Sequence, residues 1–339
     1  MLSDLALPQL RQYCPDVQEP ADFDEFWAGQ LATARAHGGE PTFAAADSRV
    51  RHAEVLDVTF PGYGGEPVRA WLLDPHERAP GATLVVEFIG YGGGRGDPFD
   101  WLTFSCAGYP HLIMDTRGQG GGWRGADTPD LSDNGAPSTP GFMTRGIADP
   151  RTYFYTRLFI DAARATDAAR RHPAIAGLPL VTTGRSQGGG LAIAAAHLGD
   201  DITAALPDVP FLAHPRRAVD VTDTRPYGEL AEYCRVHSDQ SDQVFTTLSY
   251  IDVVNHAKRA SAPALFSVGL ADAITPPSTI FAAFHHYAGR KDIAVYPFSG
   301  HEGGETRHFL AQLDFLAGLA ADGRPADPEE VTVSRSPAS

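Results

Sequence analysis

The stretch from Leu180 to Leu191, LVTTGRSQGGGL, decides how this chain folds. Its first four residues are apolar or β-branched, as in a buried strand, and a helix begins within its glycines. Ser186 lies between them in the pattern G-x-S-x-G, in which a tight turn from strand to helix exposes a nucleophilic serine. Glycines at positions 184 and 188 relieve backbone crowding in such a turn. A glycine-rich helix start without catalysis is the alternative.

Apolar runs of strand length recur on both sides of this stretch, and segments with helical spacing separate the later runs. Strand and helix in alternation predict an α/β fold with a mainly parallel central sheet and helices on both faces. The first two strands are expected to form a hairpin, and Asp22 is placed to cap an N-terminal helix. The predicted strands are 55–60, 68–73, 84–89, 112–114, 180–183, 206–209, 265–268 and 293–296, and the predicted helices are 157–169, 191–198, 278–287 and 306–319.

The chain is expected to form one domain over residues 1–322. Within it, residues 126–150 are rich in Pro, Gly, Asp and Ser and are predicted to form a long ordered loop. Residues 323–339 lack any periodicity and are predicted to be disordered.

Composition excludes several classes of function. The formal net charge of −15 arises from 42 acidic and 27 basic residues among 339, and so negative a surface argues against nucleic-acid binding. No apolar run approaches the ~20 residues of a membrane helix, and the first residues lack the basic and apolar parts of a secretory signal. Cys14, Cys106 and Cys234 are widely spaced, as expected of free thiols in a reducing compartment. We therefore expect a soluble cytoplasmic protein.

A nucleophilic serine needs an adjacent base, and in hydrolases of this type an acidic residue assists that base. Two residues that follow predicted strands can fill these roles. Asp272 follows the strand 265–268 and His301 follows 293–296, so both lie at the carboxyl ends of strands, where open parallel sheets place their sites. Their order after Ser186 is that of hydrolases with this turn. Capping of the next helix is the alternative for Asp272. A metal site formed by His301, Glu302 and His308 is disfavoured, because the zinc pattern H-E-x-x-H needs both histidines on one helix and two glycines interrupt this one. No metal or cofactor is therefore predicted.

The glycine-rich segment 90–96, GYGGGRG, follows the predicted strand 84–89. In hydrolases with a G-x-S-x-G turn, two backbone N–H groups stabilise the oxyanion: that of the residue after the serine, here Gln187, and one from the loop after an earlier strand. Segment 90–96 suits the second position. It is not a nucleotide-binding loop, because it lacks G-K-[S/T] and is followed by the acidic Asp97.

Three short motifs of the chain occur together in one known family: Arg-Gly-Gln, Gly-x-Ser-Gln-Gly and His-Glu. They stand here at 117–119, 184–188 and 301–302. The chain resembles carbohydrate esterase family seven, the acetyl xylan esterases that also act as cephalosporin C deacetylases, from near its start to about residue 320. Longer stretches that carry the likeness are 22–27, 114–116, 140–146, 149–153, 208–211 and 276–279.

The resemblance implies an α/β-hydrolase fold in which Ser186, Asp272 and His301 form the catalytic triad. It places the backbone N–H groups of Tyr91 and Gln187 in the oxyanion hole. The serine hydroxyl would attack an ester carbonyl while the histidine takes its proton, and water would then hydrolyse the acyl-enzyme.

The resemblance also puts Tyr91, Phe211 and Pro226 on the pocket wall, where bulky groups leave room for a short acyl chain. The implied substrates are small acetylated compounds, such as acetylated xylose, xylo-oligosaccharides and cephalosporin C-like acetates. Family members are typically cytoplasmic hexamers whose active sites face an internal cavity that excludes polymeric xylan. The loop 126–150 resembles their interface insertion.

The Arg117-Gly118-Gln119 motif is expected to be structural, with Gly118 permitting a turn and Arg117 paired with a carboxylate. Arg185 departs from the family pattern, because many members carry a small residue there. It is expected either to change the charge of the pocket or to pair with an acid. Gly121 and Gly122 stand where serines are often seen.

Two other functions fit the motifs less well. A serine peptidase of the same fold, as in the prolyl oligopeptidases, usually carries a large extra domain for which no segment is left. A catalytically silent hydrolase fold that serves as an interaction module would usually lack a triad member, and all three are present here.

Overall fold

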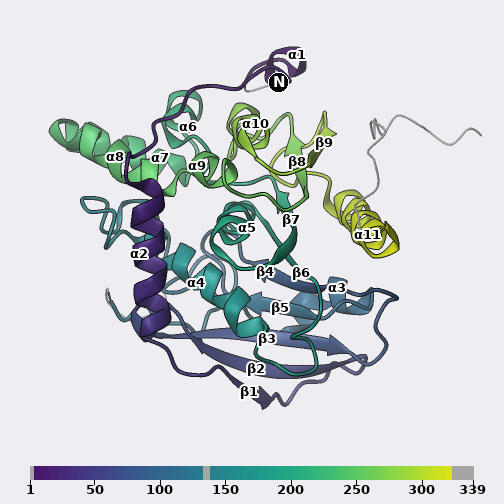
Figure 1. Ribbon diagram of the computed structural model, residues 1–339. Helices are drawn as coiled ribbons and strands as arrows, with labels where there is room; N and C mark the ends of the chain where they lie inside the picture. The colour runs from purple at the N-terminus through teal and green to yellow at the C-terminus, as the bar shows by residue number, and fades with distance from the viewer. Residues whose placement is uncertain (1–3, 133–137, 323–339) are drawn as a thin grey trace, which may run out of the picture.

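Nine strands form one sheet within residues 4–132 and 138–322, the parts of the chain that this computed structural model describes (Figure 1). The strand order is β1-β2-β3-β5-β4-β6-β7-β8-β9. The strands from β4 to β9 are parallel, and β1 to β3 form an antiparallel extension. The predicted, mainly parallel sheet is confirmed. The strands are β1 (Thr42–Ala45), β2 (Ala53–Pro61), β3 (Pro67–Pro75), β4 (Leu84–Phe88), β5 (His111–Met114), β6 (Leu180–Arg185), β7 (Ile202–Asp208), β8 (Ala264–Gly269) and β9 (Lys291–Tyr296).

The hairpin of β2 and β3 is confirmed, and two strands differ from the sequence prediction. β1 was not predicted, because its four mostly exposed residues give too short a pattern. β7 begins at Ile202 rather than at 206. Its small residues carry a weak strand signal, but they pair in register with the buried β6, so the sheet rather than local propensity decides their conformation.

Helices cover both faces of the sheet, as predicted. In β4, Leu84 and Val86 join the large core cluster that contains residues of α4 and α5. Val85 points to the other face, where it packs in a smaller cluster with Phe104 of α3 and Leu316 of α11. The helices are α1 (Leu7–Leu10), α2 (Phe23–Ala36), α3 (Leu102–Cys106), α4 (Phe154–Ala169), α5 (Gln187–Leu198), α6 (Pro215–Val221), α7 (Tyr227–Val236), α8 (Ser241–Ile251), α9 (Val253–Ala257), α10 (Pro277–His286) and α11 (Glu305–Asp322).

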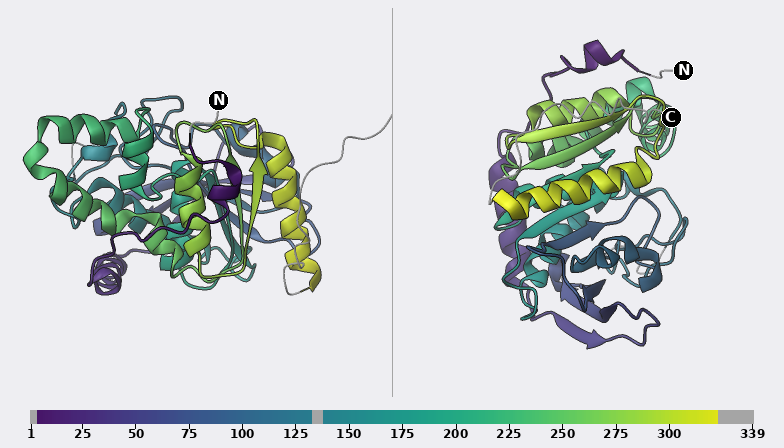
Figure 2. Two further views of the ribbon diagram at one scale, coloured as in Figure 1. Left: turned by 90° about the horizontal axis from the view of Figure 1, so that it is seen from above. Right: turned by 90° about the vertical axis from the view of Figure 1, so that its right-hand side faces the viewer.

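The N-terminal helices extend along the outside of the fold. Helix α2 runs beside α4, and α1 lies against α10, at the opposite end of the molecule from β1 (Figures 1 and 2). Asp22 precedes α2, but the predicted cap is absent: the side chain of Asp22 makes no capping hydrogen bond. Instead its Oδ1 accepts a hydrogen bond of 2.6 Å from the hydroxyl of Tyr250 on α8, which ties α2 to that helix.

Four helices between β7 and β8 have no counterpart in the sequence prediction. Helices α6 to α9 gather at the upper left of Figure 1. They bring Glu229 of α7 into hydrogen-bond contact with Tyr91, which follows β4. This group of helices therefore supplies one side of the candidate site.

The long loop predicted at 126–150 folds back onto the domain where it is described. Asp130, Phe142 and Met143 are almost completely buried, and residues 142–144 form a short 3-10 helix. The predicted disordered segment, 323–339, lies outside the described residues. Among the helices of the described ranges, none combines the length and apolar character that crossing a bilayer would require.

Candidate active site

Ser186 occupies a strained turn between β6 and α5. Its φ of 59° and ψ of −117° lie in a region that residues other than glycine rarely adopt. A β-carbon at Gly188 would come within 2.0 Å of the carbonyl oxygen of Phe88 in β4, and one at Gly184 within 2.6 Å of the same atom. The two glycines of the motif are therefore required because β4 passes so close to the turn. The side chain of Ser186 stays 8% exposed.

His301 and Asp272 meet at the carboxyl ends of β9 and β8. The His301 Nδ1 atom lies 2.9 Å from Asp272 Oδ2. The fully buried carboxylate also accepts hydrogen bonds from the backbone N–H groups of Ile274 and Thr275 and from the Thr275 hydroxyl, at 2.7 to 2.9 Å. Asp272 thus closes the local turn and holds the imidazole at the same time. These bonds fix which way the ring faces.

Ser186 and His301 both line one cavity of about 770 Å³. Tyr91 and Pro226, which the family resemblance puts on the pocket wall, line it as well. Within the described ranges, no hydrogen bond joins Ser186 Oγ to His301. Such a bond between a nucleophile and its base is often long until substrate binds.

Phe211 lies elsewhere than expected. It is fully buried and is not among the residues that line the cavity. Its ring packs behind the ring of Tyr91, with centroids 6.4 Å apart, and against Tyr227 at 4.5 Å. Phe211 therefore supports the wall from behind, because the backbone hydrogen bond from its N–H to Ser186 O draws it under the turn.

The backbone N–H groups of Tyr91 and Gln187 are the two that the family resemblance places in the oxyanion hole. Neither has a hydrogen-bond acceptor within residues 4–132 and 138–322. Gln187 is the first residue of α5, where N–H groups have no partner within the helix and where the helix dipole favours negative charge. Tyr91 follows β4, the neighbour of β6 in the sheet.

Two buried glutamines connect the segments that carry these N–H groups. The Gln187 side chain donates to Ile89 O (3.0 Å), and its Oε1 accepts from Gln119 Nε2 (2.8 Å). Gln119 Oε1 accepts in turn from the N–H of Gly92 (2.6 Å). Residues 89 and 92 flank Tyr91, so the two amides hold its peptide in place. We call Gln119 and Gln187 the amide pair. From its sequence, Gln119 was expected only to be part of a structural motif.

The Tyr91 side chain is anchored from the opposite side. Its hydroxyl donates to the carboxylate of Glu229 (2.8 and 2.9 Å) and accepts from the N–H groups of Gly141 and Phe142 (3.0 and 2.9 Å). Burial raises the pKa of both the Tyr91 hydroxyl and the Glu229 carboxyl. Sequence reasoning missed Glu229, and no motif or spacing around it signals this contact.

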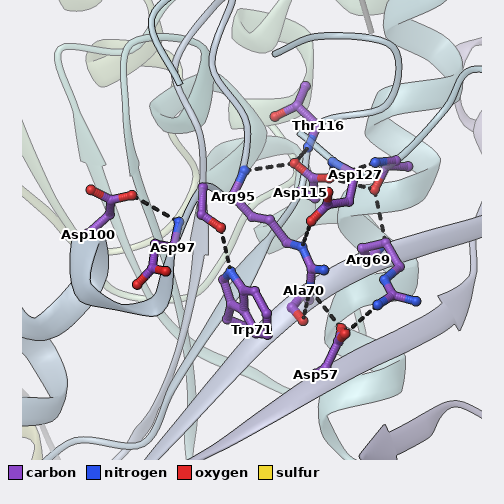
Figure 3. A network of polar contacts seen from close by, with 12 residues as sticks. Asp57, Arg69, Ala70, Trp71, Arg95, Asp97, Asp100, Asp115, Thr116 and Asp127 are labelled. Carbon is purple, nitrogen blue, oxygen red and sulfur yellow. Dashed lines mark hydrogen bonds and ion pairs between the residues drawn. The ribbon is translucent and has the colours of Figure 1, made fainter. Parts of the chain in front are cut away.

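The far end of the glycine-rich segment is held by the network in Figure 3. The N–H of Arg95 donates to Asp115 Oδ1 (2.8 Å), while Asp115 Oδ2 accepts from the N–H groups of Asp127 and Thr128. The guanidinium of Arg95 binds Asp57 and Asp127, each at 2.8 Å. Burial nevertheless raises the pKa of Asp115.

Arg117 has the structural role that was expected. Its buried guanidinium binds both oxygens of Asp161, together with Glu66 (2.6 Å) and Asp130 (3.2 Å). These carboxylates hold the pKa of Arg117 above its ordinary value even though burial acts to lower it. Gly118 adopts a φ of 63°, as the expected turn requires.

Arg185 pairs with an acid and also lines the cavity. Its Nε donates to Asp208 Oδ2 at 2.8 Å, and the side chain stays 43% exposed. Both alternatives considered for this residue therefore hold together: it forms an ion pair, and it contributes positive charge to the wall.

Comparison with known proteins identifies the family. The family model described as acetyl xylan esterase (AXE1) matches residues 1–319. The chain belongs to this family. An acetyl xylan esterase from Paenibacillus sp. R4 shares 35% identity, with a TM-score of 0.81 over 92% of this chain and 99% of that one. Acetyl xylan esterase 1 from Thermoanaerobacterium sp. JW/SL YS485 shares 32% identity, with a TM-score of 0.83 over 93% and 99%.

Acetyl esterase Axe7A of Xylanibacter ruminicola is 23% identical over 303 residues, which are 85% of this chain. The chain spans 64% of the length of that relative. The acylaminoacyl peptidase of Pyrococcus horikoshii, at 14% identity and a TM-score of 0.56, shares the fold alone. Together these relatives confirm the α/β-hydrolase fold, and the acetyl xylan esterase family indicates a carboxylic ester hydrolase.

Proposed function

We propose that the protein is a serine esterase that removes acetyl groups from small acetylated substrates. One observation carries the proposal: Ser186 in its strained turn and His301, whose Nδ1 lies 2.9 Å from the buried Asp272, line a single cavity. Ser186 Oγ attacks the ester carbonyl and His301 takes its proton. Asp272 fixes the tautomer of the imidazole and stabilises its protonated form.

The oxyanion of the tetrahedral intermediate would lie between the N–H groups of Tyr91 and Gln187. Their lack of any acceptor in the described chain supports this role, because two free donors can then converge on one oxygen. His301 returns the proton to the leaving alcohol, and the acetyl group stays on Ser186. Water that the same histidine activates then releases acetate.

A short acyl chain is favoured by the packing around Tyr91. Its hydroxyl is hydrogen-bonded to Glu229 and its ring packs against that of Phe211, so this part of the cavity wall cannot easily move to admit a longer acyl chain. The substrates we propose are acetylated xylose, xylo-oligosaccharides and cephalosporin C-like acetates. By family resemblance we also propose a cytoplasmic hexamer, which light scattering coupled to gel filtration would test.

The decisive experiment compares 4-nitrophenyl acetate, a longer-chain 4-nitrophenyl ester and an aminoacyl anilide, with Ser186→Ala as control. We expect hydrolysis of the acetate above the longer ester, none of the anilide, and no measurable turnover in the variant. Mass spectrometry of the quenched wild type should show one acetyl group on the peptide that contains Ser186. Cleavage of the anilide alone would indicate a peptidase, and no cleavage at all a silent hydrolase fold.

A further inference from the structure

The cavity wall is positively charged although the chain as a whole is not. Three arginines line the cavity, Arg124, Arg185 and Arg225, against one carboxylate, that of Glu87. The formal charge of the whole chain is −15. Glu87 Oε2 lies 2.8 Å from His111 Nε2. Positively charged side chains therefore predominate in the cavity wall, although the composition of the whole chain is acidic.

Arg185 is the arginine nearest to Ser186 in the chain. Asp208 occupies its Nε, but no hydrogen bond within the described residues occupies Nη1 or Nη2. Asp208 itself does not line the cavity. The ion pair thus holds the guanidinium at Nε and leaves Nη1 and Nη2 for hydrogen bonds to a ligand. A guanidinium held in this way can bind a carboxylate through two parallel hydrogen bonds.

Arg225 and Arg124 are arranged in a similar manner. Arg225 Nη2 lies 3.0 Å from Glu232, and the Arg225 side chain is 61% exposed. Arg124 lies 3.2 Å from Asp100 and stacks over Trp101 and Trp123. Both arginines line the cavity, whereas neither carboxylate partner does.

We propose that the cavity selects acetyl esters whose alcohol part carries a carboxylate, with Arg185 and Arg225 as the residues that bind it. The proposal rests on the esterase function proposed above. An acetyl group fills a small part of about 770 Å³, so the alcohol part must occupy the remainder, beside these arginines. A carboxylate there exchanges its hydration for charge-assisted hydrogen bonds.

A purely structural role for Arg185 is the competing explanation. Arg185 and Asp208 are paired residues at the ends of β6 and β7, where their ion pair can hold the strands together. If that were its only role, its loss would lower activity on charged and neutral esters by the same factor.

The test uses two esters of equal size, the acetyl esters of 3-hydroxybenzoate and of 3-hydroxybenzamide. Each kcat/KM is divided by the rate constant of the same ester with hydroxide, which removes the difference in leaving-group acidity. In the wild type we expect the charged ester to be favoured about tenfold, mainly through KM, as a charge-assisted hydrogen bond allows. The preference should shrink as NaCl is added, because salt screens exposed charges.

Arg185→Gln should lower this preference about tenfold. The matched control is Arg171→Gln, since the side chain of Arg171 is 63% exposed, lies 4.0 Å from Glu40 and does not line the cavity. The control should keep the wild-type preference. If Arg185→Gln does not fold, as judged by circular dichroism, Arg225→Gln decides in its place: a fall in the preference supports the proposal, and no change overturns it.

Two outcomes would overturn the proposal while the esterase function stands: a wild type that cleaves the neutral ester at least as well as the charged one, or an Arg185→Gln variant that loses activity on both by the same factor. If the wild type cleaves neither ester, the esterase function itself fails. The two failures are therefore distinguishable.

Discussion

Replacing Gln119 by Met should weaken catalysis without touching any group that contacts substrate. The change removes the acceptor for the N–H of Gly92, now at 2.6 Å, and the donor to Gln187 Oε1, now at 2.8 Å. Met has a similar length and shape, so the buried space stays filled. Gln187 keeps its bonds to Tyr155 and Ile89, whereas the N–H of Gly92 loses its only acceptor within the described residues.

The magnitude follows from these contacts. One buried N–H without an acceptor costs about 1–3 kcal/mol, and one lost neutral hydrogen bond about 1 kcal/mol, so the free energy of unfolding should fall by about 2–4 kcal/mol. Removal of a whole oxyanion donor costs about 10²–10³ in kcat. Because the Tyr91 N–H is loosened rather than removed, we expect kcat to fall about tenfold to a hundredfold, with KM nearly unchanged.

Urea unfolding gives the stability, and initial rates on 4-nitrophenyl acetate give kcat and KM. The matched control is Gln312→Met, at a buried glutamine of α11. This control should show no more than a loss of stability, with kcat within about twofold of the wild-type value. The reasoning would be refuted if Gln119→Met lost the calculated stability and yet kept a wild-type kcat. The amide pair would then hold the fold together without positioning the oxyanion donors.

Three further predictions concern the same site and the core behind it. Gly188→Ala should abolish esterase activity, because the added β-carbon would lie 2.0 Å from the backbone oxygen of Phe88. Activity near that of the wild type would show that β4 can move to make room for the methyl group. Tyr91→Phe removes the hydroxyl that donates to the Glu229 carboxylate and accepts from two backbone N–H groups, so thermal unfolding should show a loss of about 3–5 kcal/mol. A loss below about 1 kcal/mol would contradict this expectation. Burial raises the pKa of Asp252 to about 7, so the contribution of this group to the free energy of unfolding should fall by about 4 kcal/mol as pH rises from about 4 through 7. Asp252→Asn keeps an oxygen for both N–H groups that now bind Oδ1, so the urea stability of the wild type should fall relative to that of this variant over the same range; parallel curves would exclude a contribution from Asp252.

Most of the fold was predictable because its signals are local. The strand, the glycines and the helix around Ser186 lie within a dozen residues, and each later strand carries its own apolar run. The elements that were missed have weak local signals. β1 is short and exposed, and the small residues at the start of β7 form a strand only because β6 lies beside them.

The candidate site divides in the same way. The contact between Asp272 and His301 could be expected from the sequence because each follows a strand, and parallel strands bring their carboxyl ends to one edge. Glu229 was missed because its contact with Tyr91 spans 138 residues and depends on the path of the helices between β7 and β8. Phe211 was placed on the wall by resemblance, whereas the structure puts it behind Tyr91.

The sequence by itself determined the class of fold, the serine turn and the identity of the acid and base that we assign to it. These depend on backbone conformation and strand order, which neighbouring residues encode. Only the tertiary structure decided which side chains hold the oxyanion loop, which face of Arg185 stays open and what stands behind the cavity wall. Such contacts join segments that are distant in the chain, and their geometry exists only once the core has packed.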